Sequence, residues 1–563
     1  MHEFALASVM EWTQLSAVEC VRALKEKRVT PLELLEAAAA RIAATDAAVN
    51  ATPVLCLARA RRCIEAFGEA GAPGPLHGLP VLVKDTQSVS GVRWTSGEPR
   101  HAHRVGVNTD PCIAAVEAAG GVVIGKTNVP ESAAGSHSFN PIFGVTACPF
   151  DTSLSAGGSS GGAAAALAVG QIWLATGSDL GGSLRQPAAF CGVCGLRPSY
   201  GLVPGRVVGA PPRPLNAVDG PMGRTVADVA LLLDAMVPRG APSSSSLPPP
   251  PRGSYVAHAC APLEAADLPR RVGWSADLGG VLRGVDGELS AAVARAAALL
   301  GEAVGAAVVQ SAPRWVMPPE PPSSSAPEAR MDVEGIFRTL RADNFVANRG
   351  GRRRIGAWLR GAAGTTAKPE VVWNVLTGLV EPGRARRAAR LVEEMRRAAA
   401  RMFEEQAVDV WVVPCTLLLP FDKALRYPSR LAADPSVELA DYIAWMLPCT
   451  AISLLDLPSI SLPCGLSRDG RPLAVQLVGR AAGTEPQLLA TAAALERAVA
   501  AQPGAAAAAV PRDPAPPPVP PRRPSASGPT TAAEAAEAHG VPPTDEEAIA
   551  RLVAGAGAGR SKL

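Results

Sequence analysis

The chain has 563 residues, of which 48% are hydrophobic and 19% charged, a composition typical of a globular protein with at least one large buried core. Its 54 basic and 51 acidic residues leave a net charge of +3, which does not favour nucleic acid or another polyanion as a partner. The most apolar window, residues 163–175, is too short to span a bilayer, and the N-terminus lacks the features of a signal peptide.

Helices are predicted first, between residues 16 and 67. Thr30 and Glu33 have the spacing of a capping box, and Pro31 occupies the first helical position. A buried strand follows and ends at Lys84, next to Asp85. Two interpretations of Lys84 remain open: it reaches the surface or pairs with Asp85, or it is a desolvated, neutral catalytic base.

Alternation of helices and short apolar strands continues through the next hundred residues. A helix after Asn108 precedes a strand at 122–124, and a helix at 160–169 precedes a strand at 172–176 and a glycine-rich turn into a further short helix. This order predicts an α/β fold in which a central, twisted, mixed β-sheet is flanked on both faces by α-helices.

The second half continues the same domain, which is predicted to cover residues 1–502. Pro/Ser-rich insertions are expected near 241–253 and 318–327. Residues 334–405 are predicted to be mostly helical. Strands are expected at 271–274, 306–309, 410–413, 460–462 and 474–478, with helices at 286–301 and 485–500.

The Ala/Pro-rich tail, residues 503–563, is predicted to be mostly disordered because it lacks the apolar residues that offset ordering entropy. It ends in Ser561, Lys562 and Leu563, a tripeptide that the peroxisomal import receptor recognises. We therefore expect a peroxisomal location, and otherwise a cytoplasmic one.

Eleven scattered cysteines, an odd number, predict reduced thiols in an intracellular protein. Cys191 and Cys194 have redox or zinc spacing, but no second pair or nearby histidine completes a metal site, so we expect a structural role, with a redox role as the alternative. The basic run at 352–354 is expected to be a solvated face, and phosphate binding is its alternative.

Two glycine-flanked serine clusters carry the functional prediction. The first is GGSSGG at 157–162, and the second is GSDLGGSLRQPA at 177–188. The first lacks the Lys-Ser/Thr pair of a phosphate-binding Walker loop. The structural alternative is that the glycines form turns and the serines cap helices, as Ser160 is placed to do at the start of the helix.

Both clusters resemble the segments that define the amidase signature family of serine amidohydrolases. Further matching segments are Gly78-Leu79-Pro80, Lys84-Asp85, Phe190-Cys191-Gly192, Gly220-Pro221-Met222, Leu462-Pro463-Cys464-Gly465 and Gln476-Leu477-Val478-Gly479. The resemblance covers roughly residues 15–500 and is far more specific than a lone glycine loop.

The resemblance implies a Ser-cisSer-Lys triad, in which Ser183 is the nucleophile, Ser159 the bridging serine and Lys84 the base. A serine needs a base to remove its proton, and a lysine serves only when burial keeps it neutral.

The remaining members of the predicted site surround this triad. The expected oxyanion hole consists of the backbone N–H groups of Leu180, Gly181, Gly182 and Ser183, and the supporting residues are Ser160, Asp179 and Arg185. His77 and His137 are expected to be bystanders.

Several residues differ from the family pattern, and we expect them to affect the choice of substrate rather than the reaction, because none belongs to the triad. Ala156 replaces a usual proline, Gln186 a common aliphatic residue, and Leu455-Asp456-Leu457 a usual Thr-Gly-Leu. Asp456 is expected to alter local packing or the pocket. Tryptophans in the variable middle region are candidates for the pocket: Trp315, Trp358, Trp373 and Trp445.

The main functional prediction is an amidohydrolase that cleaves a carboxylic amide with an apolar acyl, aryl-alkyl or fatty acyl group, without metal or organic cofactor. The partners expected are the amide substrate and the import receptor, and a homodimer is compatible with the sequence. One alternative is the A-type subunit of a glutamyl-tRNA amidotransferase; the other is a catalytically inactive, amidase-like receptor or scaffold.

Overall fold

The computed structural model describes residues 11–205, 213–237, 247–261, 268–317, 330–348, 372, 382–502 and 513–514. The predictions for the basic run at 352–354, for Trp358 and Trp373, for the loop at 318–327 and for Ser561, Lys562 and Leu563 fall outside these residues. In the first insertion, the described residues 247–253 contain neither helix nor strand.

The N-terminal helices begin where the sequence predicts them. Helix α2 (Ala17–Lys25) and helix α3 (Pro31–Val49) both start with a complete capping box. In α3, the Thr30 side chain accepts from the Glu33 N–H and the Glu33 carboxylate accepts from the Thr30 N–H, which satisfies two of the free donors at the helix start. Helix α4 (Leu57–Phe67) follows the short strand β1 (Val54–Leu55).

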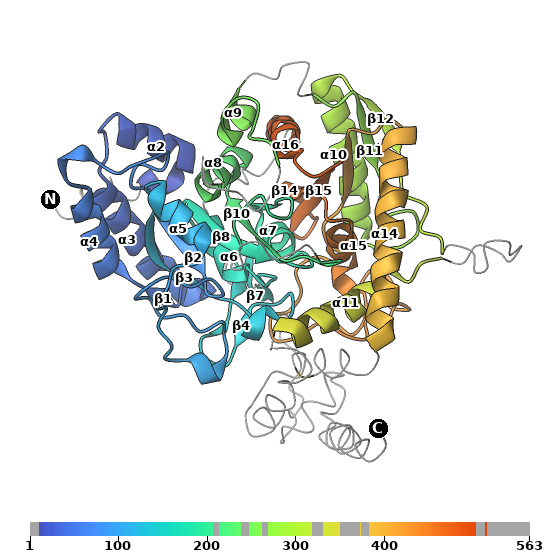
Figure 1. The fold of residues 1–563 in the computed structure, drawn as a ribbon, viewed down its shortest axis with the longest axis horizontal. Helices are drawn as coiled ribbons and strands as arrows, with labels where there is room; N and C mark the ends of the chain where they lie inside the picture. Colours follow the sequence, from blue (N-terminus) through green and yellow to red (C-terminus); the bar gives the residue numbers. More distant parts are fainter. Residues whose placement is uncertain are drawn as a thin grey trace, which may run out of the picture.

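A large mixed sheet forms the centre of the molecule and confirms the predicted fold class. Its 11 described strands run in the order β1-β3-β2-β8-β10-β9-β14-β15-β13-β11-β12. Strand β2 is parallel to β3 and β8, whereas β10 is antiparallel to β8. Figure 1 shows the sheet crossing the molecule from the blue strands near the N-terminus to the orange and lime-green ones. Beyond β1, the strands are β2 (Pro80–Lys84), β3 (Val122–Thr127), β8 (Leu174–Asp179), β9 (Cys194–Arg197), β10 (Val218–Gly223), β11 (Arg271–Trp274), β12 (Ala307–Gln310), β13 (Val410–Pro414), β14 (Ser459–Leu466) and β15 (Pro472–Gly479).

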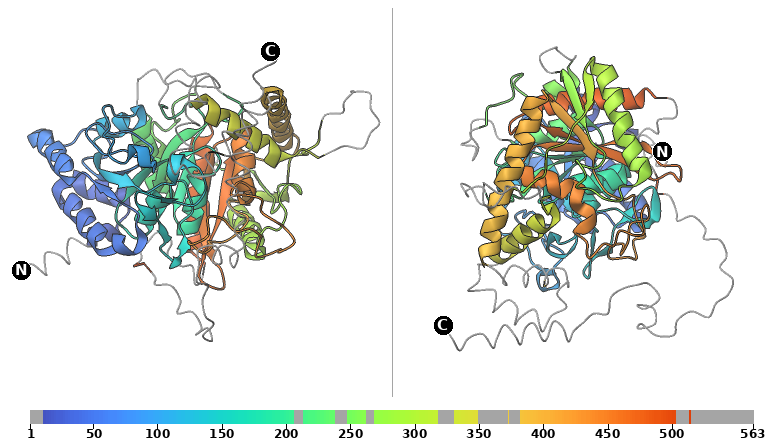
Figure 2. Two further views of the ribbon diagram at one scale, coloured as in Figure 1. Left: turned by 90° about the horizontal axis from the view of Figure 1, so that it is seen from below. Right: turned by 90° about the vertical axis from the view of Figure 1, so that its right-hand side faces the viewer.

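Helices cover both faces of this sheet. Helices α6 (Gly161–Ala168) and α7 (Arg185–Cys191) pack on one face, and α8 (Val226–Met236), α10 (Gly287–Val304) and α16 (Glu485–Ala500) pack on the other. In the right-hand view of Figure 2, the orange helix α14 (Pro382–Glu405) and the lime-green helix α10 lie on opposite sides of the orange strands. The other elements are α5 (Pro111–Ala118), α9 (Tyr255–Cys260), α11 (Val333–Asn348) and α15 (Leu447–Leu455), and two small hairpins made of β4 (Phe139–Asn140) with β5 (Gly144–Val145) and β6 (Ala147–Cys148) with β7 (Asp151–Ser155).

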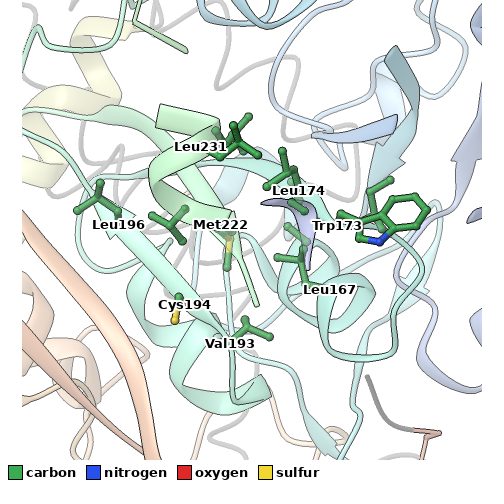
Figure 3. Packing of buried hydrophobic residues seen from close by; sticks show 14 of the residues in the cluster. Leu167, Trp173, Leu174, Val193, Cys194, Leu196, Met222 and Leu231 are labelled. Atoms are coloured by element: carbon green, nitrogen blue, oxygen red, sulfur yellow. The ribbon is translucent and has the colours of Figure 1, made fainter. Parts of the chain in front are cut away.

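The core is continuous around the strands that carry the serine clusters. Figure 3 shows Leu167 of α6, Leu174 of β8, Met222 of β10 and Leu231 of α8 in one apolar cluster with Cys194 of β9. All eight residues of α6 are buried, and because most are alanine or glycine the helix packs closely on the sheet. This packing fixes the loop at the start of α6 against the ends of β2 and β8. Among the described residues, none of the helices has the length and hydropathy needed to cross a membrane.

Candidate active site

Lys84 is the last residue of β2 and lies in the interior, with 0% of its surface exposed. Of the interpretations left open by the sequence, this burial rules out the one in which Lys84 reaches the surface. Its Nζ atom lies within hydrogen-bond distance of Ser159 Oγ at 2.9 Å, Ser160 Oγ at 2.8 Å, Ser178 Oγ at 3.0 Å and the Ser178 carbonyl oxygen at 3.3 Å. Four oxygens thus surround one buried amine, and two of them belong to the first serine cluster.

The loop that carries Ser159 is braced from outside by residues 136–138. The Gly158–Ser159 peptide bond is cis, as the resemblance implies. The Ser138 N–H donates to the Gly157 carbonyl at 3.0 Å, and the Gly161 N–H donates to Ser138 Oγ at 3.1 Å. His137 contacts Ser155 Oγ at 2.7 Å and the Lys423 carbonyl at 2.9 Å, and so helps to hold the loop in place.

Ser160 occupies the N-cap position of α6, as predicted, but its side chain caps nothing. The hydroxyl instead accepts the shortest hydrogen bond from Lys84. The capping interpretation is therefore wrong, because the ammonium or amine of a buried lysine competes for the same oxygen. Ser160 orients Lys84, in keeping with the supporting role that the resemblance implies.

Asp179 and Arg185 hold the second serine cluster together. The Asp179 carboxylate accepts from the Gly182 N–H at 2.7 Å and the Leu184 N–H at 3.1 Å. Arg185 binds the same carboxylate through Nε at 3.0 Å and Nη2 at 2.9 Å, and both side chains are fully buried. This bidentate pair fixes the loop around Ser183 to the end of β8.

The opposite charges of Asp179 and Arg185 shift the pKa of each residue towards its ionised form. Burial alone would raise the pKa of Asp179, but the guanidinium groups of Arg185 and Arg197 hold it well below its usual range. Burial acts to lower the pKa of Arg185, yet Asp179 keeps that pKa above its usual value. The pair is therefore ionised, and it anchors the loop as a charged unit.

The backbone N–H groups of the loop are not equivalent. Gly182 donates to Asp179, whereas the N–H groups of Leu180, Gly181 and Ser183 have no hydrogen-bond acceptor within the described residues. Of the four backbone N–H groups predicted for the oxyanion hole, three are therefore available to a ligand. The fourth, that of Gly182, ties the loop to the Asp179 carboxylate.

Ser183 is buried, but slightly less so than Ser159, Ser160 and Lys84. Its surface is 8% exposed, against 1% for Ser159 and 0% for Ser160 and Lys84. The Ser183 carbonyl accepts from the Ser160 N–H at 3.2 Å, which joins the two serine clusters directly. The two serine clusters therefore lie side by side, with Lys84 bound to the first of them.

Two further polar residues of this region were missed by the sequence analysis. Ser178 contacts Lys84, and Arg197 donates to the Asp179 carbonyl at 2.7 Å. Arg197 also binds Asp456 at 3.0 Å, so the departure at Asp456 supplies a carboxylate to a buried cation. Ser178 lies within the second serine cluster and Arg197 follows the matched segment Phe190-Cys191-Gly192, but their partners Lys84 and Asp456 are distant in sequence and no spacing rule predicts them.

Apolar side chains pack against the same loop. The position that a Cβ atom on Gly181 would occupy lies 2.6 Å from the Phe337 ring and 3.1 Å from the Thr450 methyl group. Nearby, Phe190 of α7 stacks on Trp445 with ring centroids 5.7 Å apart. Trp315 lies apart from the loop and lines a cavity of about 730 Å³ with Arg330 and Leu447.

The part of the chain that the structure describes contains no group of three or more His, Cys, Asp or Glu residues that could hold a metal ion. Cys191 and Cys194 are buried free thiols.

Comparison with known proteins identifies the family. The sequence profile described as Amidase matches residues 33–489, which is most of the chain. The chain belongs to the amidase signature family. It is an enzyme of the class that acts on carbon–nitrogen amide bonds, as the solved relatives also indicate.

Curated relatives of this amidase include the A-type subunits of glutamyl-tRNA(Gln) amidotransferases. The protein from Synechococcus sp. (strain CC9605) is 34% identical over 498 residues, which cover 84% of this chain and 94% of the relative. The protein from Anaeromyxobacter dehalogenans (strain 2CP-C) is also 34% identical, over 86% of this chain and 96% of the relative.

Solved structures of similar fold include hydrolases. The structure of 6-aminohexanoate cyclic dimer hydrolase has a TM-score of 0.68 and 26% identity, and covers 87% of this chain and 98% of its own. A bacterial aryl acylamidase of the amidase signature family has a TM-score of 0.73 at 24% identity, with coverage of 87% and 99%, and supports the fold alone.

Proposed function

We propose that this amidase hydrolyses a carboxamide through an acyl-enzyme on Ser183. The observation that carries the proposal is the buried hydrogen bond between Lys84 Nζ and Ser159 Oγ, in a loop that the Ser160 N–H joins to the Ser183 carbonyl. A buried amine within reach of a hydroxyl is the arrangement that a lysine base requires.

In the proposed cycle, neutral Lys84 takes the proton of Ser159 while Ser159 takes that of Ser183. The Ser183 oxygen attacks the amide carbonyl, and the resulting oxyanion accepts hydrogen bonds from the free N–H groups of Leu180, Gly181 and Ser183. The proton returns through Ser159 to the leaving nitrogen, which departs as ammonia or an amine. Water, activated along the same path, then releases the acid and restores Ser183.

Glutamine is the substrate that the sequence relatives favour. The relatives that match this chain over 94–96% of their own length are A-type subunits of glutamyl-tRNA(Gln) amidotransferases. This similarity supports an ammonia-releasing component of that assembly more strongly than it supports hydrolysis of an apolar acyl amide. The solved hydrolases of similar fold support a freestanding enzyme instead.

An apolar acyl amide is the second candidate, and the surroundings of the loop favour it. The Phe337 ring and the Thr450 methyl group pack against Gly181, next to the proposed oxyanion hole. An aryl or alkyl group would find apolar partners there, whereas a charged substrate would need groups that these two residues do not provide.

A panel of amides distinguishes the two candidates. Glutamine, an aryl acetamide and a fatty acyl amide are incubated with the enzyme, and ammonia or amine release is measured for wild type, Ser183→Ala and Lys84→Met. We expect turnover of at least one amide by wild type and a loss of more than about 100-fold in Lys84→Met, the range that general acid–base catalysis supplies.

Lys126→Met is the matched control. Lys126 is also fully buried, on the neighbouring strand β3, but it donates to the Gln87 carbonyl rather than to the serines. Equal losses in both variants, measured per folded molecule, would contradict the proposal. Copurification with a tRNA-binding partner and transfer of ammonia to a glutamate-charged tRNA would select the amidotransferase candidate.

The cellular location of the enzyme is a further part of this proposal. The C-terminal Ser561, Lys562 and Leu563 support import into peroxisomes, which a fusion of the last residues to a fluorescent protein would test.

A further inference from the structure

Two buried cysteines meet behind the loop that carries Ser183. Cys415 directly follows β13, and Cys449 lies in the first turn of α15. Their Sγ atoms are 3.8 Å apart, and neither residue is exposed. A disulfide needs an S–S distance of about 2.05 Å, so closing this pair requires a movement of about 1.8 Å.

Cys449 also touches the loop itself. The position that a Cβ atom on Gly182 would occupy lies 2.5 Å from Cys449 Cβ, so the Gly182 backbone packs closely against the Cys449 side chain. The Cys449 carbonyl accepts from Arg185 Nη2 at 3.2 Å and from Ser453 Oγ at 3.0 Å. A displacement of Cys449 therefore acts on both Gly182 and Arg185.

The two thiols have different environments. The Cys449 thiol donates to the Cys415 carbonyl at 3.1 Å, and burial raises the pKa of Cys449 well above its usual value. Burial also acts on Cys415, but its contacts with Cys449 and with Ser461 Oγ at 3.5 Å, and the Arg185 charge, bring its pKa below the usual value. Since the thiolate is the reactive form, the lower pKa favours Cys415 as the thiol that attacks an oxidant.

We propose that Cys415 and Cys449 form a redox modification site, in which hydrogen peroxide joins them in a disulfide that displaces the Gly182 loop. The Cys415 thiolate attacks one peroxide oxygen, giving a sulfenic acid and hydroxide. The Cys449 thiol then attacks the Cys415 sulfur, forming the S–S bond and releasing water. The two sulfurs lose two electrons, which the peroxide gains, and a dithiol reductant reverses the step.

The loss of activity that follows rests on the proposed function, because it requires that the loop around Gly182 supports the reaction at Ser183. Misplacement of a reacting group by about 1 Å can cost about 100-fold in rate. The disulfide itself does not depend on that function.

The test uses the reduced full-length enzyme, exposed to increasing hydrogen peroxide. Peptide mapping by mass spectrometry without reduction detects the Cys415–Cys449 crosslink, and the rate of Ser183 labelling by a fluorophosphonate measures the state of the site. Hydrogen exchange of residues 179–184 reports the loop directly and needs no activity. Variants Cys415→Ser and Cys449→Ser are compared with Cys260→Ser, which removes an exposed thiol.

We expect the crosslink in wild type and Cys260→Ser, with faster exchange of the loop and labelling at least tenfold slower, both restored by dithiothreitol. Cys415→Ser should keep its own initial labelling rate under the same treatment. The proposal is overturned if no Cys415–Cys449 peptide forms, if loop exchange is unchanged by the crosslink, or if Cys415→Ser loses activity as wild type does. Absence of labelling in the reduced enzyme would count against the proposed function alone, and the mapping and exchange data would still decide the disulfide.

Discussion

Replacing Asp179 with asparagine removes the charge that balances the buried guanidinium of Arg185. In the native protein, Asp179 accepts four hydrogen bonds: two from Arg185 and one each from the N–H groups of Gly182 and Leu184. Asparagine has the same shape, but its NH₂ group cannot accept, so at least one of these donors loses its partner.

The expected cost is large because both partners are fully buried. Removing one member of a buried ion pair leaves an uncompensated charge and costs about 3–5 kcal/mol of unfolding free energy. The same change removes the acceptor of either the Gly182 N–H or the Leu184 N–H, which bind different oxygens of Asp179, so we expect Ser183 labelling to slow as well. Urea denaturation at pH 7 measures the first effect and fluorophosphonate labelling the second.

An exposed ion pair provides the control. Glu36 and Arg61 are 2.7 Å apart, with side chains 47% and 44% exposed, and Glu36→Gln should cost less than about 1 kcal/mol. A loss in Asp179→Asn no larger than in Glu36→Gln would refute the reasoning. Because the pKa of Asp179 is lowered in the folded state, its stabilising effect should be complete above about pH 5 and decline as the pH falls further.

Two further predictions concern a serine and a buried carboxyl group. Ser160→Ala should slow the labelling of Ser183 about tenfold or more, because Lys84 loses its shortest hydrogen bond, whereas Ser16→Ala, which removes a true helix cap, should lower stability and leave labelling unchanged. Burial raises the pKa of Glu496 to about 7, so the folded protein binds this proton more tightly than the unfolded chain and the free energy of unfolding should fall as the pH rises from about 4.5 to 7. Glu496→Gln should flatten that fall in urea denaturation at pH 5 and 8, and an unchanged slope would contradict the assignment.

Much of the fold follows from local sequence patterns. Strands with continuous apolar runs, such as β13, and the helix α16 over residues 485–500 lie where the sequence predicts them. Strand β10 (Val218–Gly223) was not predicted, because its two glycines and proline weaken the strand pattern. Helix α8 was also missed, although Thr225 and Asp228 have the spacing of the capping box that the structure contains.

The hydrogen bonds and ion pairs of the site were harder to predict from the sequence. Motif matches bring Lys84, Ser159 and Ser183 into consideration, but the hydrogen bond from Lys84 to Ser160 depends on the packing of β2 against α6. The pairing of Arg197 with Asp456 joins residues 259 positions apart. Asp456 lies at the end of α15 in the left-handed conformation, with φ of 58°, where glycine is the commonest residue. Glycine could not supply the carboxylate that binds Arg197.

The central claim is that Ser183 is the nucleophile and that Lys84 activates it. The most direct test is to treat the reduced enzyme with a fluorophosphonate and to locate the adduct by peptide mapping in wild type, Ser183→Ala and Lys84→Met. The account predicts one adduct on Ser183 in wild type, none in Ser183→Ala, and labelling slower by more than about 100-fold in Lys84→Met. An adduct on another serine, or wild-type labelling rates in Lys84→Met, would contradict it.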